Sequence, residues 1–153
     1  MAGADSGRAR ARRASRVTWH TVRVNSAGLI ELVASEPTIA QLIDAARTAA
    51  EPTLDAVCPA AVRPLLAAAL SERGGRPLLV VTSTYREAEN TRDALASLLG
   101  DDSVVYYPAW ETLPHERLSP RSDTVGRRLA VLRRLAGNAR LPAPSVVVAP
   151  VRA

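Results

Sequence analysis

Three short apolar runs, separated by segments with helical periodicity, constrain the fold of this chain more than any other feature. The runs are residues 78–81, 103–107 and 146–149. Continuous runs of valine and leucine, without alternating polar positions, indicate strands that are covered on both faces, as in parallel sheets. A helix between two such strands forms a right-handed crossover. The sequence therefore predicts an α/β fold with a parallel sheet.

Further elements are predicted before residue 78. Apolar residues within 39–46 have helical spacing, and Ser35 is a candidate cap for that helix. Residues 53–58 are a short strand candidate, and residues 60–73 are a second helix that stops at a glycine pair. The predicted order therefore begins with a helix, a strand and another helix before the strand at 78–81.

Two later helices are predicted from their caps and apolar stripes. The first follows Ser83 or Thr84, and the second follows Ser122 or Asp123, because these residue types cap helices. Each helix has a stripe of apolar residues that we expect to be buried. The stripes are Ala88, Leu95, Leu98 and Leu99 in the first helix, and Val125, Leu129, Leu132 and Leu135 in the second.

The positive charge of the chain is concentrated near its N-terminus. Residues 1–25 contain six arginines and one acidic residue, and this excess equals the net charge of +5 for the whole chain. We expect residues 1–26 to form a basic disordered tail, able to contact phosphates without sequence specificity. No apolar run reaches the roughly 18 residues of a membrane span, and no apolar stretch follows the arginines as in a signal peptide. We therefore expect a cytoplasmic protein without membrane contact.

Residues that often carry chemistry show no catalytic or metal-binding pattern. Cys58 is the single cysteine, and the two histidines, His20 and His115, do not stand at metal-ligand spacing. No strand-turn-helix signature of a nucleophilic serine is present. The sequence therefore predicts no catalytic residue and no metal site.

The loop after the strand candidate at 53–58 stands where P-loop proteins bind nucleotide. It contains Cys58, Pro59, Ala60 and Ala61 in place of GxxxxGK[ST], so it lacks the glycines, the lysine and the magnesium-binding hydroxyl of that motif. Proline also removes a backbone N–H donor. We interpret these four residues as a degenerate nucleotide loop and expect no cofactor in this chain.

The segment between the strand at 103–107 and the following helix concentrates aromatic rings beside arginines. These residues are Tyr106, Tyr107, Trp110, His115, Arg117 and Arg121. Rings and guanidinium groups together can stack on bases and pair with phosphates. Alternatively, Trp110 and Leu113 pin a proline-stiffened loop against the sheet edge. The helix that follows carries four arginines, which suit either an anionic partner or a solvated face.

Residues 107–135 and 146–152 carry motifs that resemble the UvrB-like module of bacterial transcription-repair coupling factors. A W-E-T-L-P core, an S-P-x-x-D step, an R-L-x-x-L-x-x-L helix and a valine-rich strand follow one another in that order. The resemblance extends more weakly over residues 27–152. It implies a parallel-sheet RecA-like domain, related to P-loop NTPases and to the UvrB repair protein, and split by an inserted domain. Residues 27–153 are then its first half, incomplete at the C-terminus.

The resemblance also implies a function in DNA repair. Full-length members resemble ATP-driven DNA translocases that displace stalled RNA polymerase and recruit nucleotide excision repair through UvrA. The motor domains with their ATP and magnesium, the polymerase-binding domain and most of the UvrA-docking insert are implied to lie beyond Ala153. We therefore expect a non-catalytic module that contacts DNA and proteins.

The family signature supplies candidates for contacts to nucleic acid or to neighbouring domains. They are Tyr107, Trp110, Glu111, Leu113, Pro114, Arg117, Ser119, Pro120, Asp123, Arg127 and Arg128. Two alternative functions remain open. One is a UvrB-type or other P-loop ATPase, against which the missing GK[ST] argues. The other is a stand-alone nucleic-acid-binding α/β domain that uses Tyr106, Trp110 and the arginine-rich helix.

Overall fold

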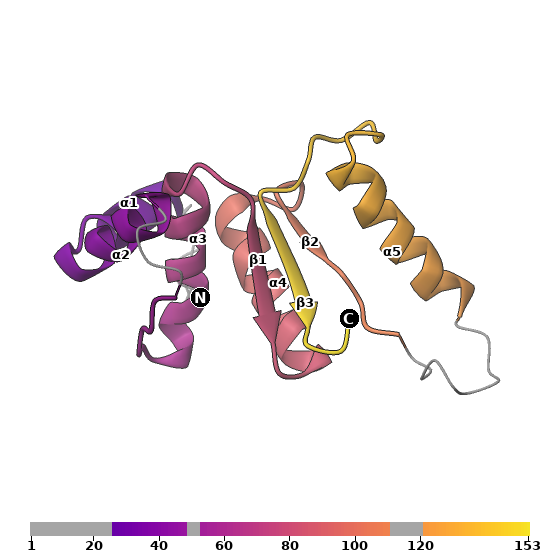
Figure 1. Cartoon of the computed structure of the whole chain (residues 1–153), viewed down its shortest axis with the longest axis horizontal. Coiled ribbons are helices and arrows are strands. Elements are labelled where there is room, and N and C mark those ends of the chain that lie inside the picture. Colours follow the sequence, from indigo (N-terminus) through magenta and orange to yellow (C-terminus); the bar gives the residue numbers. More distant parts are fainter. Residues whose placement is uncertain (1–25, 49–52, 111–120) are drawn as a thin grey trace, which may run out of the picture.

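The computed structural model describes residues 26–48, 53–110 and 121–153, and within them a three-stranded sheet lies among five α-helices. Figure 1 shows the N-terminal helices on one side of the sheet and α5 on the other. The elements in chain order are α1 (Ser26–Ala34), α2 (Pro37–Thr48), the 3-10 helix η1 (Ala60–Val62), α3 (Arg63–Arg73), β1 (Leu78–Thr82), α4 (Tyr85–Leu99), β2 (Val104–Tyr106), α5 (Ser122–Leu135) and β3 (Val146–Pro150).

The sheet has the order β1-β3-β2, and all its strands are parallel. The last strand in the sequence therefore lies in the middle, where Val148 pairs with Val80 of β1 and Val147 pairs with Val105 of β2. Helices α4 and α5 provide the crossovers that parallel strands require. The predicted α/β class with a parallel sheet is confirmed, and the architecture is that of a small, incomplete RecA-like domain.

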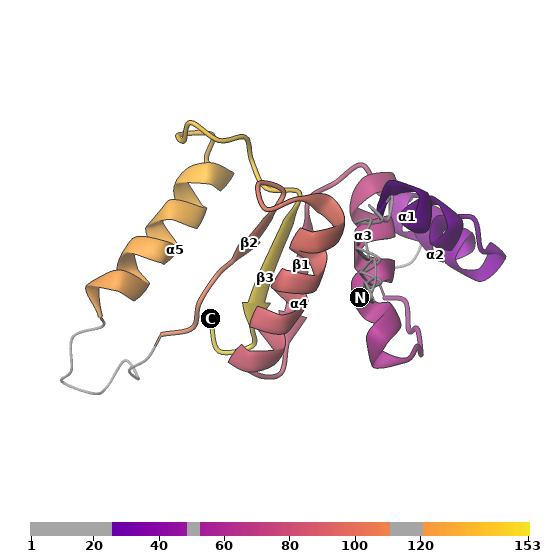
Figure 2. The ribbon, with the colours of Figure 1, turned by 180° about the vertical axis from the view of Figure 1, so that it is seen from behind.

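One face of the sheet carries the main core. Helix α4 lies behind the strands in Figure 1 and in front of them in Figure 2, and helices α1 and α3 pack beside it. Ile30 of α1 and Leu95 of α4 pack with Val146 and Val148 of β3, and all four are fully buried. The apolar stripe predicted for α4 is part of this core, because Ala88 and Leu95 are buried in it and Leu98 and Leu99 pack against it.

The opposite face of the sheet is covered less completely. Val131 of α5 packs there against Val105 and Val147. Leu79 and Val81 of β1 point to this face but remain 62% and 56% exposed. The expectation that residues 78–81 form a strand buried on both faces is wrong for the described part of the chain, because β1 is an edge strand that α5 does not reach.

The strand predicted at residues 53–58 is also wrong. These residues carry no regular secondary structure, and 53–57 are exposed. An apolar stretch becomes a strand only when a neighbouring strand pairs with it, and the described sheet offers it none. The described part of the chain instead begins with α1, which the sequence analysis did not assign. Residues 1–25 of the predicted tail lie outside the described residues, and Ser26 is the first residue of α1.

The helix caps were predicted with mixed success. Thr84 caps α4 as expected, because its Oγ1 accepts a hydrogen bond from the Glu87 N–H at 3.2 Å. Ser35 does not cap α2, since its hydroxyl donates to the Leu32 carbonyl oxygen, and a carboxylate oxygen of Glu36 accepts from the Ile39 N–H at 2.9 Å. A glutamate side chain is long enough to reach this N–H, and the sequence pattern favoured the shorter serine.

Helix α5 buries a different face from the one predicted, and its cap also differs. Neither Ser122 nor Asp123 caps it, since both lie within the helix and Arg121 holds the cap position without a side-chain hydrogen bond. The side chains buried against the rest of the structure are those of Thr124, Arg128 and Val131. The predicted stripe is wrong as a buried face, because Leu129, Leu132 and Leu135 are about half exposed. In the ranges described, every helix is too short or too polar to cross a bilayer.

Candidate functional site at the carboxyl ends of the strands

The carboxyl ends of the parallel strands gather the residues that the sequence analysis singled out. Ligands of open α/β sheets bind at this edge, beyond the strand ends. Helix α4 begins shortly after β1, and residues 107–110 continue from the end of β2 (Figure 1). The core on one face and the Val131 cluster on the other place α4 and α5 on opposite faces of the sheet.

Arg128 of α5 is held between two aromatic rings from the segment after β2. Its guanidinium carbon lies 4.1 Å from the ring centroid of Tyr107 and 4.3 Å from that of Trp110. Its Nη1 donates a hydrogen bond to the carbonyl oxygen of Pro108, and Arg128 as a whole is only 9% exposed. We call Tyr107, Arg128 and Trp110 the arginine sandwich. It fastens α5 to the end of β2 through cation–π contacts, which grow stronger as water is excluded.

A cavity of about 460 Å³ lies next to the arginine sandwich. We call it the aromatic pocket, and α4, the end of β2 and α5 all contribute to it. Its lining residues are Tyr85, Glu89, Tyr106, Pro108, Ala109, Trp110, Arg121, Asp123, Thr124 and Arg127. Arg127 Nη2 and Asp123 Oδ2 form an ion pair at 3.0 Å between two well-exposed side chains. The pocket thus combines three rings with groups of both charge signs.

The hydroxyl of Tyr106 stays neutral in this pocket at ordinary pH. Partial burial raises its pKa above the usual value, the negative charge of Glu89 raises it further, and Arg127 acts in the opposite direction. Both burial and a neighbouring carboxylate disfavour the phenolate. The hydroxyl can therefore donate a hydrogen bond to a ligand.

The degenerate nucleotide loop lies at the N-terminus of α3. Ala60 and Ala61 belong to η1, and the Pro59 carbonyl accepts a hydrogen bond from the Val62 N–H at 2.9 Å. Cys58 is half-buried and has no disulfide. These residues form a tight helical turn in place of the open glycine-rich loop that wraps phosphates in P-loop proteins.

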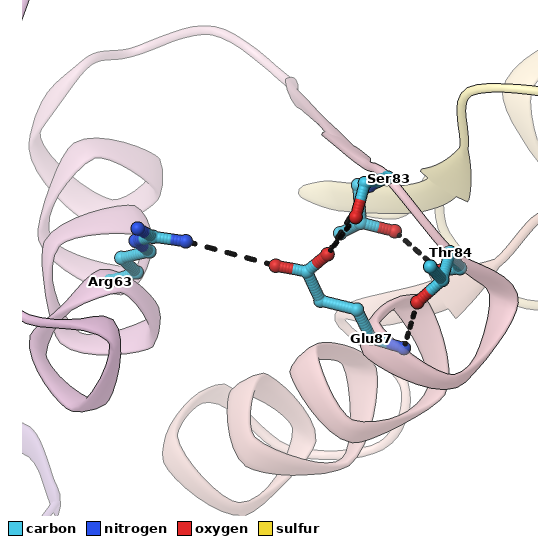
Figure 3. Close-up of polar contacts among 5 residues, drawn as sticks. Arg63, Ser83, Thr84 and Glu87 are labelled. Atoms are coloured by element: carbon cyan, nitrogen blue, oxygen red, sulfur yellow. Dashed lines mark hydrogen bonds and ion pairs between the residues drawn. The ribbon is translucent and has the colours of Figure 1, made fainter.

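A carboxylate occupies the neighbouring loop after β1. Figure 3 shows that Glu87 of α4 accepts hydrogen bonds from the hydroxyl and the backbone N–H of Ser83, at 2.8 and 3.2 Å. Its other oxygen lies 3.7 Å from Arg63 of α3. The Glu87 carboxylate already accepts the Ser83 N–H, and its negative charge would repel a phosphate from that donor. Among the described residues, no group of three or more His, Cys, Asp or Glu side chains is placed to hold a metal ion.

The structure brings together five of the predicted contact candidates. Tyr107, Trp110 and Arg128 form the arginine sandwich, and Asp123 pairs with Arg127 at the start of α5. The other candidates, Glu111, Leu113, Pro114, Arg117, Ser119 and Pro120, lie outside the described residues. Tyr85 and Glu89 were not candidates, because nothing in the sequence indicates that the first turns of α4 lie beside residues 106–127.

Comparisons with known proteins identify the family. No family model matches the chain. The chain is 51% identical over 130 residues, or 82% of its length, to the transcription-repair-coupling factors of Mycobacterium bovis and Mycobacterium tuberculosis. It is 34% identical over 91 residues, or 60% of its length, to that of Bacillus subtilis. These matches span 10% of the mycobacterial proteins and 7% of the Bacillus protein. Over the region matched, the chain belongs to the family of transcription-repair-coupling factors.

Proposed function

We propose that this chain is the N-terminal UvrB-like module of a transcription-repair-coupling factor, and that it acts in the cytoplasm by binding other macromolecules. The observation that carries this proposal is the 51% identity over 82% of the chain to proteins of that name. The whole protein would displace stalled RNA polymerase from damaged DNA and recruit nucleotide excision repair. This chain would contribute contacts to that task and no chemical step.

The geometry of the degenerate nucleotide loop supports a non-catalytic role. Phosphate binding in a P-loop needs free backbone N–H groups and a lysine. This chain has no lysine at all, and Pro59 lacks an N–H. Glu87 places a carboxylate in the adjacent loop. ATP and magnesium would then be bound by motor domains elsewhere in the full-length protein.

The uncovered face of the sheet supports completion of the domain by further chain. Leu79 and Val81 of β1 and Leu129 and Leu132 of α5 expose apolar side chains. In this proposal an inserted domain and then the second half of the RecA-like domain follow the region matched. Packing of that second half against the exposed side chains would bury them. UvrA would bind mainly to the insert, and RNA polymerase would bind to C-terminal domains.

The experiment that tests this proposal is a binding measurement with purified UvrA. The protein to use is the chain extended C-terminally through the insert and the second half of the domain, immobilised on a sensor surface. We expect a dissociation constant in the micromolar range or tighter, with much weaker binding by the 153-residue chain as the control. Absence of binding by the extended protein at micromolar concentrations would contradict the proposed function.

A further inference from the structure

The aromatic pocket has the size and the ring content of a site for one nucleotide. Its volume of about 460 Å³ lies within the range of small-ligand pockets. Its rings come from three places in the fold: Tyr85 begins α4, Tyr106 ends β2, and Trp110 follows four residues later. Tyr85 is 61% exposed and Trp110 is 43% exposed, so a planar ligand can reach both rings. Stacking on such rings is the main sequence-independent contact to unpaired bases.

The arginine sandwich fixes one of these rings in advance. Arg128 stacks on Trp110 and on Tyr107, and its hydrogen bond to the Pro108 carbonyl holds the guanidinium in place. Because Trp110 is already ordered by these contacts, a ligand that stacks on it pays little additional entropy. Trp110 still lines the pocket, so its role in the sandwich and its contact with a ligand are compatible.

The charged groups of the pocket suit a ligand that carries a phosphate at one end and polar ring atoms at the other. Arg127 lines the pocket, and its ion pair with Asp123 neutralises that carboxylate while leaving further guanidinium donors. The Tyr106 hydroxyl is a donor, and Glu89 is an acceptor for an amino or sugar hydroxyl group. A nucleotide offers partners for all of these groups, whereas a purely apolar ligand would leave them unpaired.

We propose that the aromatic pocket binds one unpaired nucleotide of single-stranded nucleic acid, with the base stacked on the rings of Tyr85 and Trp110 and the phosphate bound by Arg127. Duplex DNA is excluded because its bases are already stacked and paired. The inference rests on the proposed function, in which this chain binds other macromolecules, and goes beyond it by naming the strand form, the site and the residues. UvrA recruitment does not depend on it.

The test uses the full chain and matched variants, because the basic residues in 1–25 will add nonspecific phosphate binding to every variant alike. Fluorescence anisotropy would measure the binding of labelled oligo(dT), of oligo(rU) and of a DNA duplex of the same length. Tyr85→Ala removes an exposed stacking ring, and we expect about tenfold weaker binding of the single strands. Arg127→Gln removes the phosphate contact, and it should weaken binding and reduce the salt dependence by about one counterion.

Two controls separate the pocket from general charge and from misfolding. Arg133→Gln removes one exposed arginine from the same helix outside the pocket lining, and it should leave affinity nearly unchanged. Tyr85→Phe keeps the ring and should restore the affinity lost in Tyr85→Ala. Because Tyr85 is mostly exposed, the thermal midpoint of Tyr85→Ala should equal that of the unchanged chain.

The proposal is overturned if Tyr85→Ala weakens duplex binding as much as single-strand binding, if Tyr85→Ala binds single strands normally, or if Arg127→Gln and Arg133→Gln lose equal affinity. Tighter binding of oligo(dT) or of oligo(rU) supports the proposal and tells whether DNA or RNA is the natural strand. The extended protein with Tyr85→Ala should still bind UvrA. If the unchanged extended protein binds UvrA but not single strands, this inference alone is defeated. If the unchanged extended protein does not bind UvrA, the proposed function is defeated.

Discussion

On one face of the sheet, α1, α3 and α4 pack through fully buried aliphatic side chains, whereas on the other face α5 is fastened by an arginine. The first face includes Ile30, Leu95 and Val148, which exclude water without requiring exact orientation. The second has three small buried valines and the arginine sandwich. A cation–π stack requires a particular ring orientation, and it contributes less to the stability of the fold than a buried aliphatic core.

This difference indicates that the crossover helices α4 and α5 can differ in the free energy of local unfolding. Regions with few buried apolar contacts open locally at a lower free energy than the global unfolding transition. Helix α5 meets that description and α4 does not. The aromatic pocket lies between the two helices, so its shape depends on the weaker attachment.

The largest effect is expected from truncation in the main core. Leu95→Ala removes a fully buried side chain and should lower the free energy of unfolding by about 2–5 kcal/mol. Val131→Ala removes a smaller side chain from the sparser face and should cost about 1–2 kcal/mol. Urea denaturation followed by circular dichroism would measure both. An equal or larger loss of unfolding free energy in Val131→Ala would contradict the conclusion that the face covered by α4 is the more strongly packed one.

The next effect concerns the arginine sandwich. Arg128→Ala removes both ring contacts and the hydrogen bond to Pro108, and should lower the local stability of α5 by about 2 kcal/mol. Arg128→Lys keeps the charge but not the planar stack, so we expect only partial recovery. Native-state hydrogen exchange should show faster exchange of the α5 amides with little change in α4. Equal acceleration in both helices would show that α5 is not a separately attached unit.

A smaller effect is expected from the cap of α4 on the well-packed face. Thr84→Ala removes the hydrogen bond to the Glu87 N–H and should cost about 1 kcal/mol of unfolding free energy. Ser97→Ala is a suitable control, since the exposed Ser97 hydroxyl bonds only within its own helix, to the Ala94 carbonyl. Chemical denaturation of the two variants gives the difference. If Thr84→Ala has the same unfolding free energy as Ser97→Ala, the Thr84 cap does not stabilise α4.

The smallest effect in this chain is expected at the exposed stripe of α5. Leu129→Gln should change the unfolding free energy by less than about 0.5 kcal/mol, because Leu129 is half-exposed. The same change in a C-terminally extended protein should cost more than about 1 kcal/mol, if the second half of the domain buries this side chain. Thermal denaturation of both lengths makes the comparison. Equal small costs in both would indicate that the stripe stays uncovered.

The elements that the sequence predicted correctly carry strong local signals. The apolar runs at 78–81 and 146–149 fall within β1 and β3, and Thr84 caps α4. Residues 53–58 were misassigned because strand formation depends on a partner that local sequence does not show. The stripe of α5 was misassigned because apolar periodicity indicates a face that a partner can cover, and the described chain covers a different face.

The candidate site could be predicted only in part. The cluster of rings and arginines is visible in the sequence and includes Tyr107 and Trp110, whereas Arg128 was a candidate through the family signature. Burial of Arg128 could not be predicted, because arginine is usually exposed and its two rings lie about twenty residues earlier in the sequence. Tyr85 could not be linked to the pocket without the packing of α4 across the sheet against β2.

The central claim is that this RecA-like chain binds macromolecules and has no P-loop site for ATP. Calorimetric titration of the 153-residue chain with ATP and magnesium tests it most directly. The account predicts no binding in the micromolar range, because Pro59 and the turn of η1 replace a glycine-rich loop and the Glu87 carboxylate already accepts the Ser83 N–H. Any weak heat at millimolar ATP should be lost in Tyr85→Ala, which removes a stacking ring of the aromatic pocket. A saturable titration with a micromolar dissociation constant would contradict the account and favour a P-loop ATPase.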